Sequence, residues 1–169
     1  MEIDISQIRR DLGSTVFFDV SENIPGFLFG TDNVAFNTPL HVQIKVHNTG
    51  KLLLVQGTIQ TNLNVTCGRC LEEFIYPLEL AYEDEWILRE LASEDQKETA
   101  FLFDKDEVEI RDRILEQIVM ALPMKFICSA ECLGLCPACG VNLNSVKCKC
   151  QNKELDPRLA GLAKWRSDD

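Results

Sequence analysis

The sequence contains no apolar run of about 18 residues, the shortest that could cross a membrane as a helix. Its first residues, Met1 to Ile5, supply neither the basic nor the apolar region of a secretory signal. We therefore expect a protein that stays in the cytoplasm. Disulfide bonds are rare in that reducing compartment, so the eight cysteines are expected to bind metal instead.

Motifs of the common enzyme classes are also absent. The chain has no Gly-rich dinucleotide fingerprint, no P-loop, no HExxH motif and no GxSxG motif. The zinc deaminase pattern is missing too, because no HxE motif occurs and Leu135, not proline, precedes Cys136. The two histidines, His41 and His47, are expected on the polar face of one strand. We expect a protein that is not an enzyme and has no catalytic residues.

Charge is distributed unevenly along the chain. Residues 1–122 contain 10 Lys and Arg against 22 Asp and Glu, a net charge of −12, whereas residues 123–169 contain 7 against 5, a net charge of +2. An acidic body repels RNA and attracts basic proteins, although acidity that only maintains solubility explains the pattern equally well. Only the cysteine-rich end could approach RNA. The candidate RNA contacts there are Lys147, Lys149, Lys153 and Arg158.

All eight cysteines occur as close pairs. The pairs are Cys67 with Cys70, Cys128 with Cys132, Cys136 with Cys139, and Cys148 with Cys150. Two thiolates in a short turn can reach the same tetrahedral ion, so the four pairs could fill two zinc sites. A closed shell of four sulfurs leaves no position for water, and such an ion is structural.

Three partitions into two sites keep every pair intact. We favour the one that closes the shortest loop first. It places Cys136, Cys139, Cys148 and Cys150 in a local site, where Gly140 lets the backbone fold over the metal. The other site then contains Cys67, Cys70, Cys128 and Cys132. A single zinc ion with four spare thiols, iron in place of zinc, and disulfides are the alternatives.

The middle of the chain alternates apolar and polar residues with the period of a half-buried strand. The pattern predicts strands at about 40–46, 53–65 and 74–82. Tight connections join them, so we expect an antiparallel meander. Pro77 cannot donate to a strand ladder, which indicates an edge or a bulge at that point.

The flanking segments are less regular. Short strands are expected at 3–5 and 15–20, followed by a loop at 26–30. Residues 83–107 form an acidic connection, with a mobile loop at 93–99. Phe101 to Phe103 are then expected to return the chain to the core.

A helix is predicted at about 107–122, with Asp104 or Asp106 as its cap. Its apolar residues recur every fourth position, as in a helix that packs on a sheet. They are Ile110, Ile114, Ile118 and Leu122. Arg111 and Arg113 are expected to be solvated. A short helix begins at Asp156-Pro157.

The expected fold is α+β, an antiparallel β-meander sheet or partial barrel packed by one helix. It carries a small cysteine-rich zinc-binding lobe and a short C-terminal helix. We expect an acidic sheet domain over residues 1–122, the zinc-binding lobe over 123–152, and the C-terminal helix and tail over 153–169.

Several motifs together resemble one protein family. Cys67-Gly-Arg-Cys70-Leu-Glu-Glu-Phe74 follows a predicted strand, and Leu122-Pro123 ends the predicted helix. Then come Cys132-Leu-Gly-Leu-Cys136-Pro-Ala-Cys139-Gly140, Asn142-Leu-Asn144 and Asp156-Pro-Arg-Leu159. This combination resembles the YceD family, bacterial and plastid proteins linked to accumulation of large-subunit ribosomal RNA. The resemblance covers nearly the whole chain.

The resemblance implies a cytoplasmic, non-enzymatic factor in large ribosomal subunit biogenesis, with the cysteines as ligands of one or two structural zinc ions. The charge pattern favours binding to a basic ribosomal protein or a pre-ribosomal particle. A zinc protein that binds RNA through its basic end is the alternative, and a thiol redox protein is the third. No membrane partner and no small-molecule substrate are expected.

Overall fold

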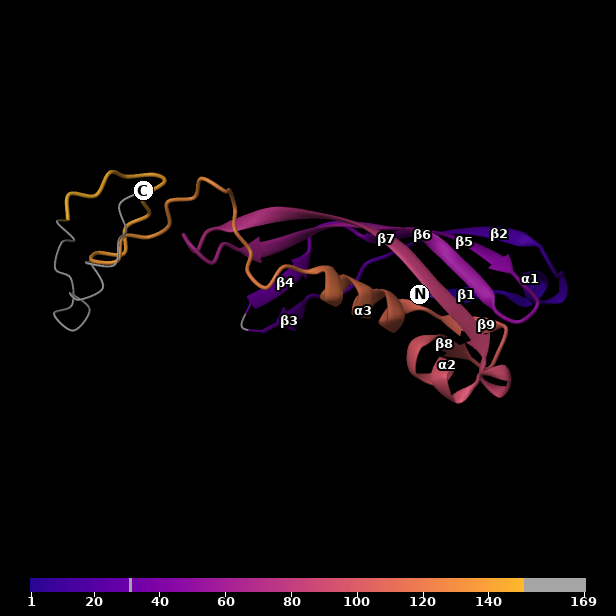
Figure 1. Ribbon diagram of the computed structural model, residues 1–169. Coiled ribbons are helices and arrows are strands. Elements are labelled where there is room, and N and C mark those ends of the chain that lie inside the picture. Colours follow the sequence, from indigo (N-terminus) through magenta and orange to yellow (C-terminus); the bar gives the residue numbers. More distant parts are fainter. Residues whose placement is uncertain (31, 151–169) are drawn as a thin grey trace, which may run out of the picture.

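The computed structural model describes residues 1–30 and 32–150, and over these residues the fold is α+β. The main sheet contains β2 (Thr15–Glu22), β3 (Phe27–Phe29), β4 (Asp32–Phe36), β5 (Leu40–Asn48), β6 (Leu53–Thr66), β7 (Glu73–Leu88) and β8 (Phe101–Phe103). Strands β5, β6 and β7 form the predicted antiparallel meander, which is confirmed. One edge of β6 is shared between β5 and β4, and β7 pairs with the whole of the other edge (Figure 1).

Alternation of side chains explains why these segments become strands with one buried face. In β5, Leu40, Val42, Ile44 and Val46 are buried, and the residues between them face outward. Gly57 interrupts the apolar series of β6. A Cβ atom there would lie 2.0 Å from the Gln43 carbonyl oxygen, so only glycine allows β5 and β6 to approach this closely.

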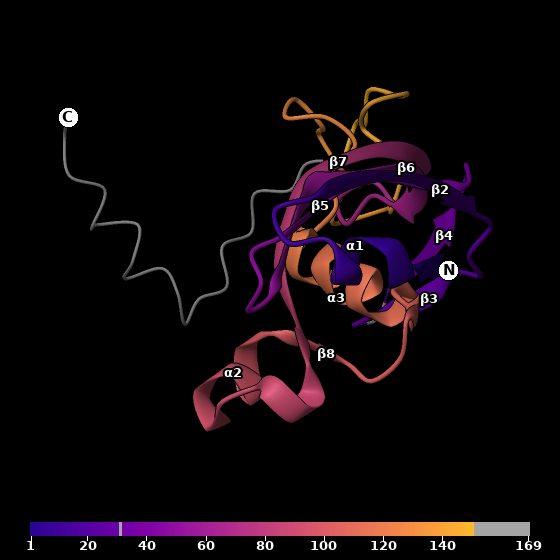
Figure 2. The ribbon, with the colours of Figure 1, turned by 90° about the vertical axis from the view of Figure 1, so that its right-hand side faces the viewer.

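Helix α3 (Arg111–Ala121) lies beneath the sheet, and the predicted apolar stripe is buried against it. Figure 2 shows β5, β6 and β7 arched over α3 and the short helix α1 (Ser6–Arg10). The predicted start of the helix was wrong. Glu107–Glu109 form strand β9, which pairs with β1 (Glu2–Asp4), and the residue that precedes the helix is Ile110.

Three other expectations need correction. The predicted loop at 26–30 contains β3, which pairs with β4. Strand β7 continues through the first part of the acidic connection to Leu88. The predicted mobile loop at 93–99 contains helix α2 (Glu94–Thr99), which follows a 3₁₀ turn at Arg89–Leu91. A capping box between Ser93 and Gln96 begins α2.

The short strand β8 returns the chain to the sheet, as the sequence predicted. It pairs in parallel with the end of β7 at Trp86 to Leu88, and the rings of Trp86 and Phe101 lie 5.4 Å apart. Because β8 pairs only with this end, β7 is an edge strand at Pro77 within the described residues. The edge position predicted from Pro77 is therefore confirmed.

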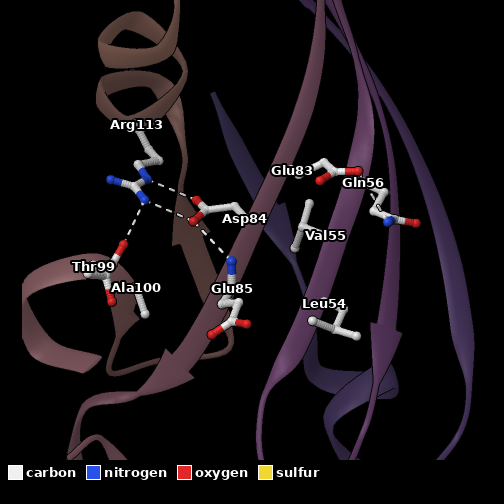
Figure 3. Close-up of a pocket in the computed structure, with 9 residues that line it drawn as sticks. All are labelled: Leu54, Val55, Gln56, Glu83, Asp84, Glu85, Thr99, Ala100 and Arg113. Carbon is white, nitrogen blue, oxygen red and sulfur yellow. Dashed lines mark hydrogen bonds and ion pairs between the residues drawn. The ribbon is translucent and has the colours of Figure 1, made fainter. Parts of the chain in front are cut away.

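Asp84 of β7 links the sheet to α3. The Arg113 guanidinium donates two hydrogen bonds of 2.9 Å to this carboxylate and a third of 3.1 Å to the Thr99 carbonyl. Tyr82 Oη and Trp86 Nε1 also donate to Asp84, at 2.8 and 3.2 Å. The hydrogen bond to Asp84 raises the pKa of Arg113. Arg113 is therefore an anchor of the body and not the solvated side chain that we predicted (Figure 3).

Arg111 is also engaged, in an ion pair with Glu22 of β2. After α3, the described chain continues to residue 150 without a helix or strand, apart from one isolated bridge between Leu135 and Asn142. The predicted C-terminal helix lies outside the described residues. None of the described helices has the length and apolar character that a membrane span requires.

Candidate metal centre

The structure brings the eight cysteines together in two groups of four. We call Cys67, Cys70, Cys128 and Cys132 cluster A, and Cys136, Cys139, Cys148 and Cys150 cluster B. Within each cluster the four sulfur atoms lie within 4.8 Å of one another. These are the two groups that the shortest-loop argument favoured.

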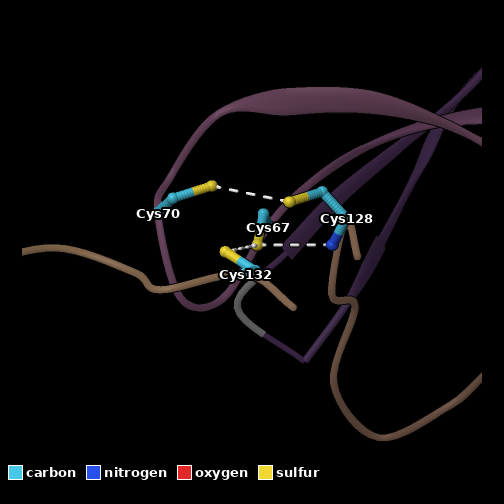
Figure 4. Close-up of side chains that lie close together, drawn as sticks. All are labelled: Cys67, Cys70, Cys128 and Cys132. Atoms are coloured by element: carbon cyan, nitrogen blue, oxygen red, sulfur yellow. Dashed lines mark hydrogen bonds between the residues drawn. The ribbon is translucent and has the colours of Figure 1, made fainter. Parts of the chain in front are cut away.

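Cluster A joins two distant parts of the chain. Cys67 and Cys70 lie in the turn between β6 and β7, and Cys128 and Cys132 follow α3. The sulfurs of Cys67 and Cys132 are 3.9 Å apart, and those of Cys70 and Cys128 are 3.7 Å apart (Figure 4). All but Cys128 are buried, and Phe74 and Ile127 pack against them. An ion here would attach the cysteine lobe, which we define as residues 123–150, to the sheet.

Cluster B lies wholly inside this lobe. The sulfur of Cys148 is 3.4 Å from that of Cys136 and 3.5 Å from that of Cys139. Cys136 is buried, whereas Cys139 and Cys150 are exposed. Cluster B therefore closes a short loop near the protein surface.

Each cluster begins with the same kind of turn. In cluster B, the Gly140 amide donates to the Cys136 carbonyl at 2.8 Å, and the Cys136 amide donates to the Val141 carbonyl at 2.8 Å. Gly140 has a φ of +72°, as expected of a glycine that lets the backbone fold over a metal. The turn directs the sulfurs of Cys136 and Cys139 toward the same point.

Cluster A repeats this turn with a different residue. The Leu71 amide donates to the Cys67 carbonyl at 2.9 Å, and the Cys67 amide donates to the Glu72 carbonyl at 2.9 Å. Leu71 has a φ of +60°, a conformation that costs a side-chain-bearing residue about 1–2 kcal/mol. Leucine thus occupies the position that glycine holds in cluster B.

The sulfur separations fit tetrahedral coordination. A zinc–sulfur bond of about 2.3 Å implies sulfurs about 3.8 Å apart, and the four separations above range from 3.4 to 3.9 Å. A disulfide bond is only about 2.05 Å long. All eight cysteines are free thiols in this structure. Each cluster can thus hold one divalent metal ion in a closed shell of four sulfurs.

Electrostatics also favours a cation in each cluster. Burial opposes ionisation of Cys67, but amide donors from Cys128, Cys70 and Arg69 lower its pKa to about 6. The amides of Cys139 and Ala138 likewise lower the pKa of Cys136 to about 7.

Cys128 and Cys150 resist ionisation, because each lies next to another cysteine of its cluster. The hydrogen bond with Cys67 raises the pKa of Cys128 to about 12, and the hydrogen bond with Cys148 raises that of Cys150 to about 12. Four thiolates can therefore coexist in one cluster only when a positive ion compensates their charge.

Two polar side chains support cluster A through hydrogen bonds, and the sequence analysis did not identify either of them. Arg69 Nη1 donates to the carbonyls of Ala130 and Cys132 at 3.3 and 3.1 Å. Asn144 Nδ2 donates to the sulfur of Cys132 at 3.4 Å, and this hydrogen bond lowers the pKa of the Cys132 thiol. The Asn142-Leu-Asn144 motif was visible in the sequence, but the sequence did not show that Asn144 contacts the sulfur of Cys132.

Two of the four predicted RNA contacts belong to the described residues. Lys147 and Lys149 are exposed on either side of Cys148. Lys153 and Arg158 lie outside the described residues. The histidines belong to neither cluster, since His41 contacts Asp19 and His47 contacts Thr15.

A comparison with protein-family profiles finds one described as "Large ribosomal RNA subunit accumulation protein YceD", which matches residues 55–165. The match includes both cysteine clusters, all but the first two residues of β6, strands β7 to β9 and α3.

Individual relatives are distant. An uncharacterized protein of Mycobacterium bovis is 25% identical over 167 residues, which are 96% of this chain and 79% of that protein. YlbN of Bacillus subtilis is 23% identical over 133 residues, 78% of this chain and 77% of YlbN. An Arabidopsis thaliana protein named "Large ribosomal RNA subunit accumulation protein YCED homolog 1, chloroplastic" is 24% identical over 157 residues, 76% of this chain and 49% of that protein. No solved structure matches the chain.

Proposed function

The chain belongs to the YceD family, and on this premise we propose that it is a non-enzymatic factor in biogenesis of the large ribosomal subunit. In this role it supports accumulation of large-subunit ribosomal RNA by binding a basic ribosomal protein, free or on a precursor particle. The name of the Arabidopsis relative places that protein in the chloroplast. We propose the cytoplasm for the present chain, in keeping with a role in ribosome assembly.

The observation that carries the proposal is the outer face of the sheet at β6 and β7, which we call the acidic face. Strand β7 directs a row of exposed carboxylates away from the core. They are Glu73, Glu79, Glu83 and Glu85. Within the described residues no ion pair involves any of the four. Their charge therefore remains available to a partner.

Neutral amides of β6 hold three carboxylates of this row in place. They are Gln56, Gln60 and Asn64, which donate to Glu83, Glu79 and Glu73 at 3.5, 3.2 and 3.3 Å. Amides orient the carboxylates without neutralising them. A cationic side chain from a partner would gain a charge-assisted hydrogen bond at such positions.

A pocket of about 520 Å³ lies at one end of the acidic face. Leu54, Glu83 and Glu85 line it, together with Arg113, whose charge is paired with Asp84, as Figure 3 shows. Lysine and arginine have apolar stems and charged ends, so this combination suits their side chains. The pocket supports a basic protein segment as the ligand of this face.

We propose that two structural zinc ions, one in each cluster, complete the protein. All eight cysteines act as thiolate ligands in this proposal. Closed tetrathiolate shells leave no coordination position for a substrate, so the ions would organise the lobe and perform no chemistry.

The test is binding of the metal-loaded chain to purified large-subunit precursor particles and to their isolated basic proteins. The informative variant replaces Glu79, Glu83 and Glu85 with glutamine. We expect the native chain to bind at low and moderate salt and the variant to bind at least 10-fold more weakly.

A matched control removes three charges elsewhere on the body. Glu90→Gln, Asp95→Asn and Glu98→Gln are exposed and do not belong to the acidic face. This control should bind like the native chain. Equal loss in both variants would show that only overall charge matters, and absence of binding by the native chain at either salt concentration would refute the proposal.

The alternative function is direct RNA binding by the cysteine lobe. It is favoured by the exposed Lys147 and Lys149, which lie in the lobe that extends beyond the sheet in Figure 1. Under this alternative, Lys147→Glu with Lys149→Glu would abolish RNA binding, whereas the three glutamine substitutions on the acidic face would not weaken it.

A further inference from the structure

The two clusters are close in sequence but share no ligand. Cluster A ends at Cys132, and cluster B begins at Cys136. Two structural ions at such sites could bind independently. One side chain from the loop of cluster B, that of Asn144, contacts a sulfur of cluster A.

Asn144 belongs to the loop that cluster B closes between Cys139 and Cys148, yet its amide group reaches cluster A. Its Nδ2 lies 3.4 Å from the Cys132 sulfur, and its Oδ1 accepts from the Leu133 backbone amide at 2.8 Å. A backbone N–H can only donate, so the oxygen must face Leu133 and the NH₂ group must face the sulfur. The side chain therefore has one orientation that satisfies both contacts.

The same loop is fastened by Asn142. Its Oδ1 accepts from the backbone amide and the Nδ2 of Asn144, both at 2.9 Å. Its Nδ2 donates to Glu72 at 2.8 Å, next to the turn that carries Cys67 and Cys70. The Leu143 amide donates to the Gly134 carbonyl at 2.9 Å, just after Cys132. The loop of cluster B is thus attached to both segments that supply the sulfurs of cluster A.

A hydrogen bond to sulfur stabilises a thiolate more than a thiol, because the anion is the stronger acceptor. Groups that hydrogen-bond to metal ligands commonly change metal affinity by about 10- to 100-fold. The contact at Cys132 is effective only while the Asn144 loop keeps its conformation. Metal in cluster B, by joining Cys136 and Cys139 to Cys148 and Cys150, would hold that loop.

We infer that Asn144 couples the two metal sites, so that an ion in cluster B raises the affinity of cluster A. Linkage requires that an ion in cluster A raises the affinity of cluster B by the same factor. Asn144 is a positioning residue in this arrangement, since it contacts a ligand and not the metal. The inference rests on the proposed metal binding and is independent of the ribosomal partner.

The experiment measures the affinity of each site in the full chain by competition between Cd²⁺ and a chelator. Site-resolved ¹¹³Cd resonances distinguish the two ions, and chains that lack either cluster assign them. Cys148→Ser with Cys150→Ser removes cluster B, and Asn144→Ala removes the contact alone. Each change should lower the affinity of cluster A by about 10- to 100-fold.

Non-additivity is the signature of coupling through this side chain. Asn144→Ala in the chain that lacks cluster B should produce little further loss at cluster A, because the loop no longer positions the amide. Asn144→Asp should weaken cluster A more than Asn144→Ala, since a carboxylate would face the thiolate. The ¹¹³Cd resonance of cluster A should also shift in Asn144→Ala.

Ser145→Ala is the matched control, an exposed position in the same loop. It should leave both affinities unchanged. An affinity of cluster A that stays within about 3-fold of native, in Asn144→Ala and in the chain without cluster B, would overturn the inference. A native chain that takes up no metal would overturn it together with the metal proposal, whereas failure to bind ribosomal components would affect only the proposed function.

Discussion

The body and the cysteine lobe of this protein are held together by different forces. In the body, one large cluster of buried apolar side chains joins the sheet, α1 and α3. Where the lobe meets the sheet, a second buried set consists of Cys67 and Cys70 of the β6–β7 turn and Cys132 of the lobe, with Phe74 and Ile127 packed against them. Burial of apolar surface explains the first region, whereas the second has too little of it.

The difference shows how a segment without a core can still have one conformation. Chains shorter than about 40 residues rarely bury enough surface to fold without a metal or another cross-link. The lobe compensates with backbone hydrogen bonds around its Cys136–Cys139 turn and with six thiols, which complete two clusters together with Cys67 and Cys70 of the β6–β7 turn. Its stability should therefore depend on metal, and that of the body should not.

Metal removal should have the largest effect and should separate the two regions. After treatment with a strong chelator, we expect backbone amides of residues 127–150, which follow the core residue Phe126, to lose most of their protection from hydrogen exchange. Amides of β5 and β6 should remain protected, because their apolar contacts do not involve the clusters. Exchange measured by mass spectrometry tests this expectation. Simultaneous loss of protection in β5 and β6 would contradict the comparison.

Asp84→Ala should weaken the body and leave the lobe intact. The substitution removes the acceptor of Arg113, Tyr82 and Trp86, and the side chain of Asp84 is only 4% exposed. We expect the free energy of unfolding to fall by about 3 kcal/mol, in the range for breaking a buried ion pair. Metal content should not change.

Urea denaturation and elemental analysis measure these two quantities. Asp104→Ala is the control, because Asp104 forms an exposed ion pair with Arg89 and should contribute less than about 1 kcal/mol. A loss of metal in Asp84→Ala would mean that the two regions are not separable.

Acid should also affect the lobe first. Protons compete with metal for thiolates, so metal release should begin at a pH well above the range in which carboxylates titrate. In the body, hydrogen bonds from the N-terminal ammonium lower the pKa of Glu22 and Glu109 from the ordinary 4.5. A carboxyl group whose pKa is lower in the folded than in the unfolded state stabilises the fold above pH 4.5. This stabilisation is lost as the pH falls through the lowered pKa of the folded state.

The measurement is a pH titration that follows metal release with an indicator and the sheet by circular dichroism. Glu22→Gln should reduce the stability of the body above pH 4.5 and make this stability less dependent on pH. The pH at which metal is released should not change. A single transition for both signals would show that body and lobe unfold together.

The smallest effects are expected from the two Cys-x-x-Cys turns. Leu71→Gly relieves a left-handed backbone but increases the flexibility of the unfolded chain, so we expect a gain of less than about 1 kcal/mol. Gly140→Ala should cost about 1 kcal/mol, since a Cβ there meets nothing within 4 Å and only the backbone conformation is unfavourable.

Thermal denaturation of the metal-loaded variants compares the two turns. If Leu71→Gly is instead destabilising, the exposed leucine side chain contributes packing that exceeds its backbone strain.

Local patterns in the sequence were sufficient to predict the meander and the buried apolar stripe of α3. Alternation along β5 and four-residue spacing from Ile110 to Leu122 reflect which side chains must leave water. The capping box at Ser93 and Gln96 was a local signal for α2 that the acidic composition obscured. Strand β9 had no local signal, because Val108 is the sole buried residue of its three and its partner β1 lies more than 100 residues away.

What the sequence determined by itself is that the cysteines act as close pairs, because two thiols a few residues apart can reach the same point in space. Loop length then favoured the division into clusters A and B. Only the tertiary structure decided that Arg113 meets Asp84 and that Asn144 meets Cys132. Both contacts depend on where distant segments pack, and side-chain composition alone does not specify those positions.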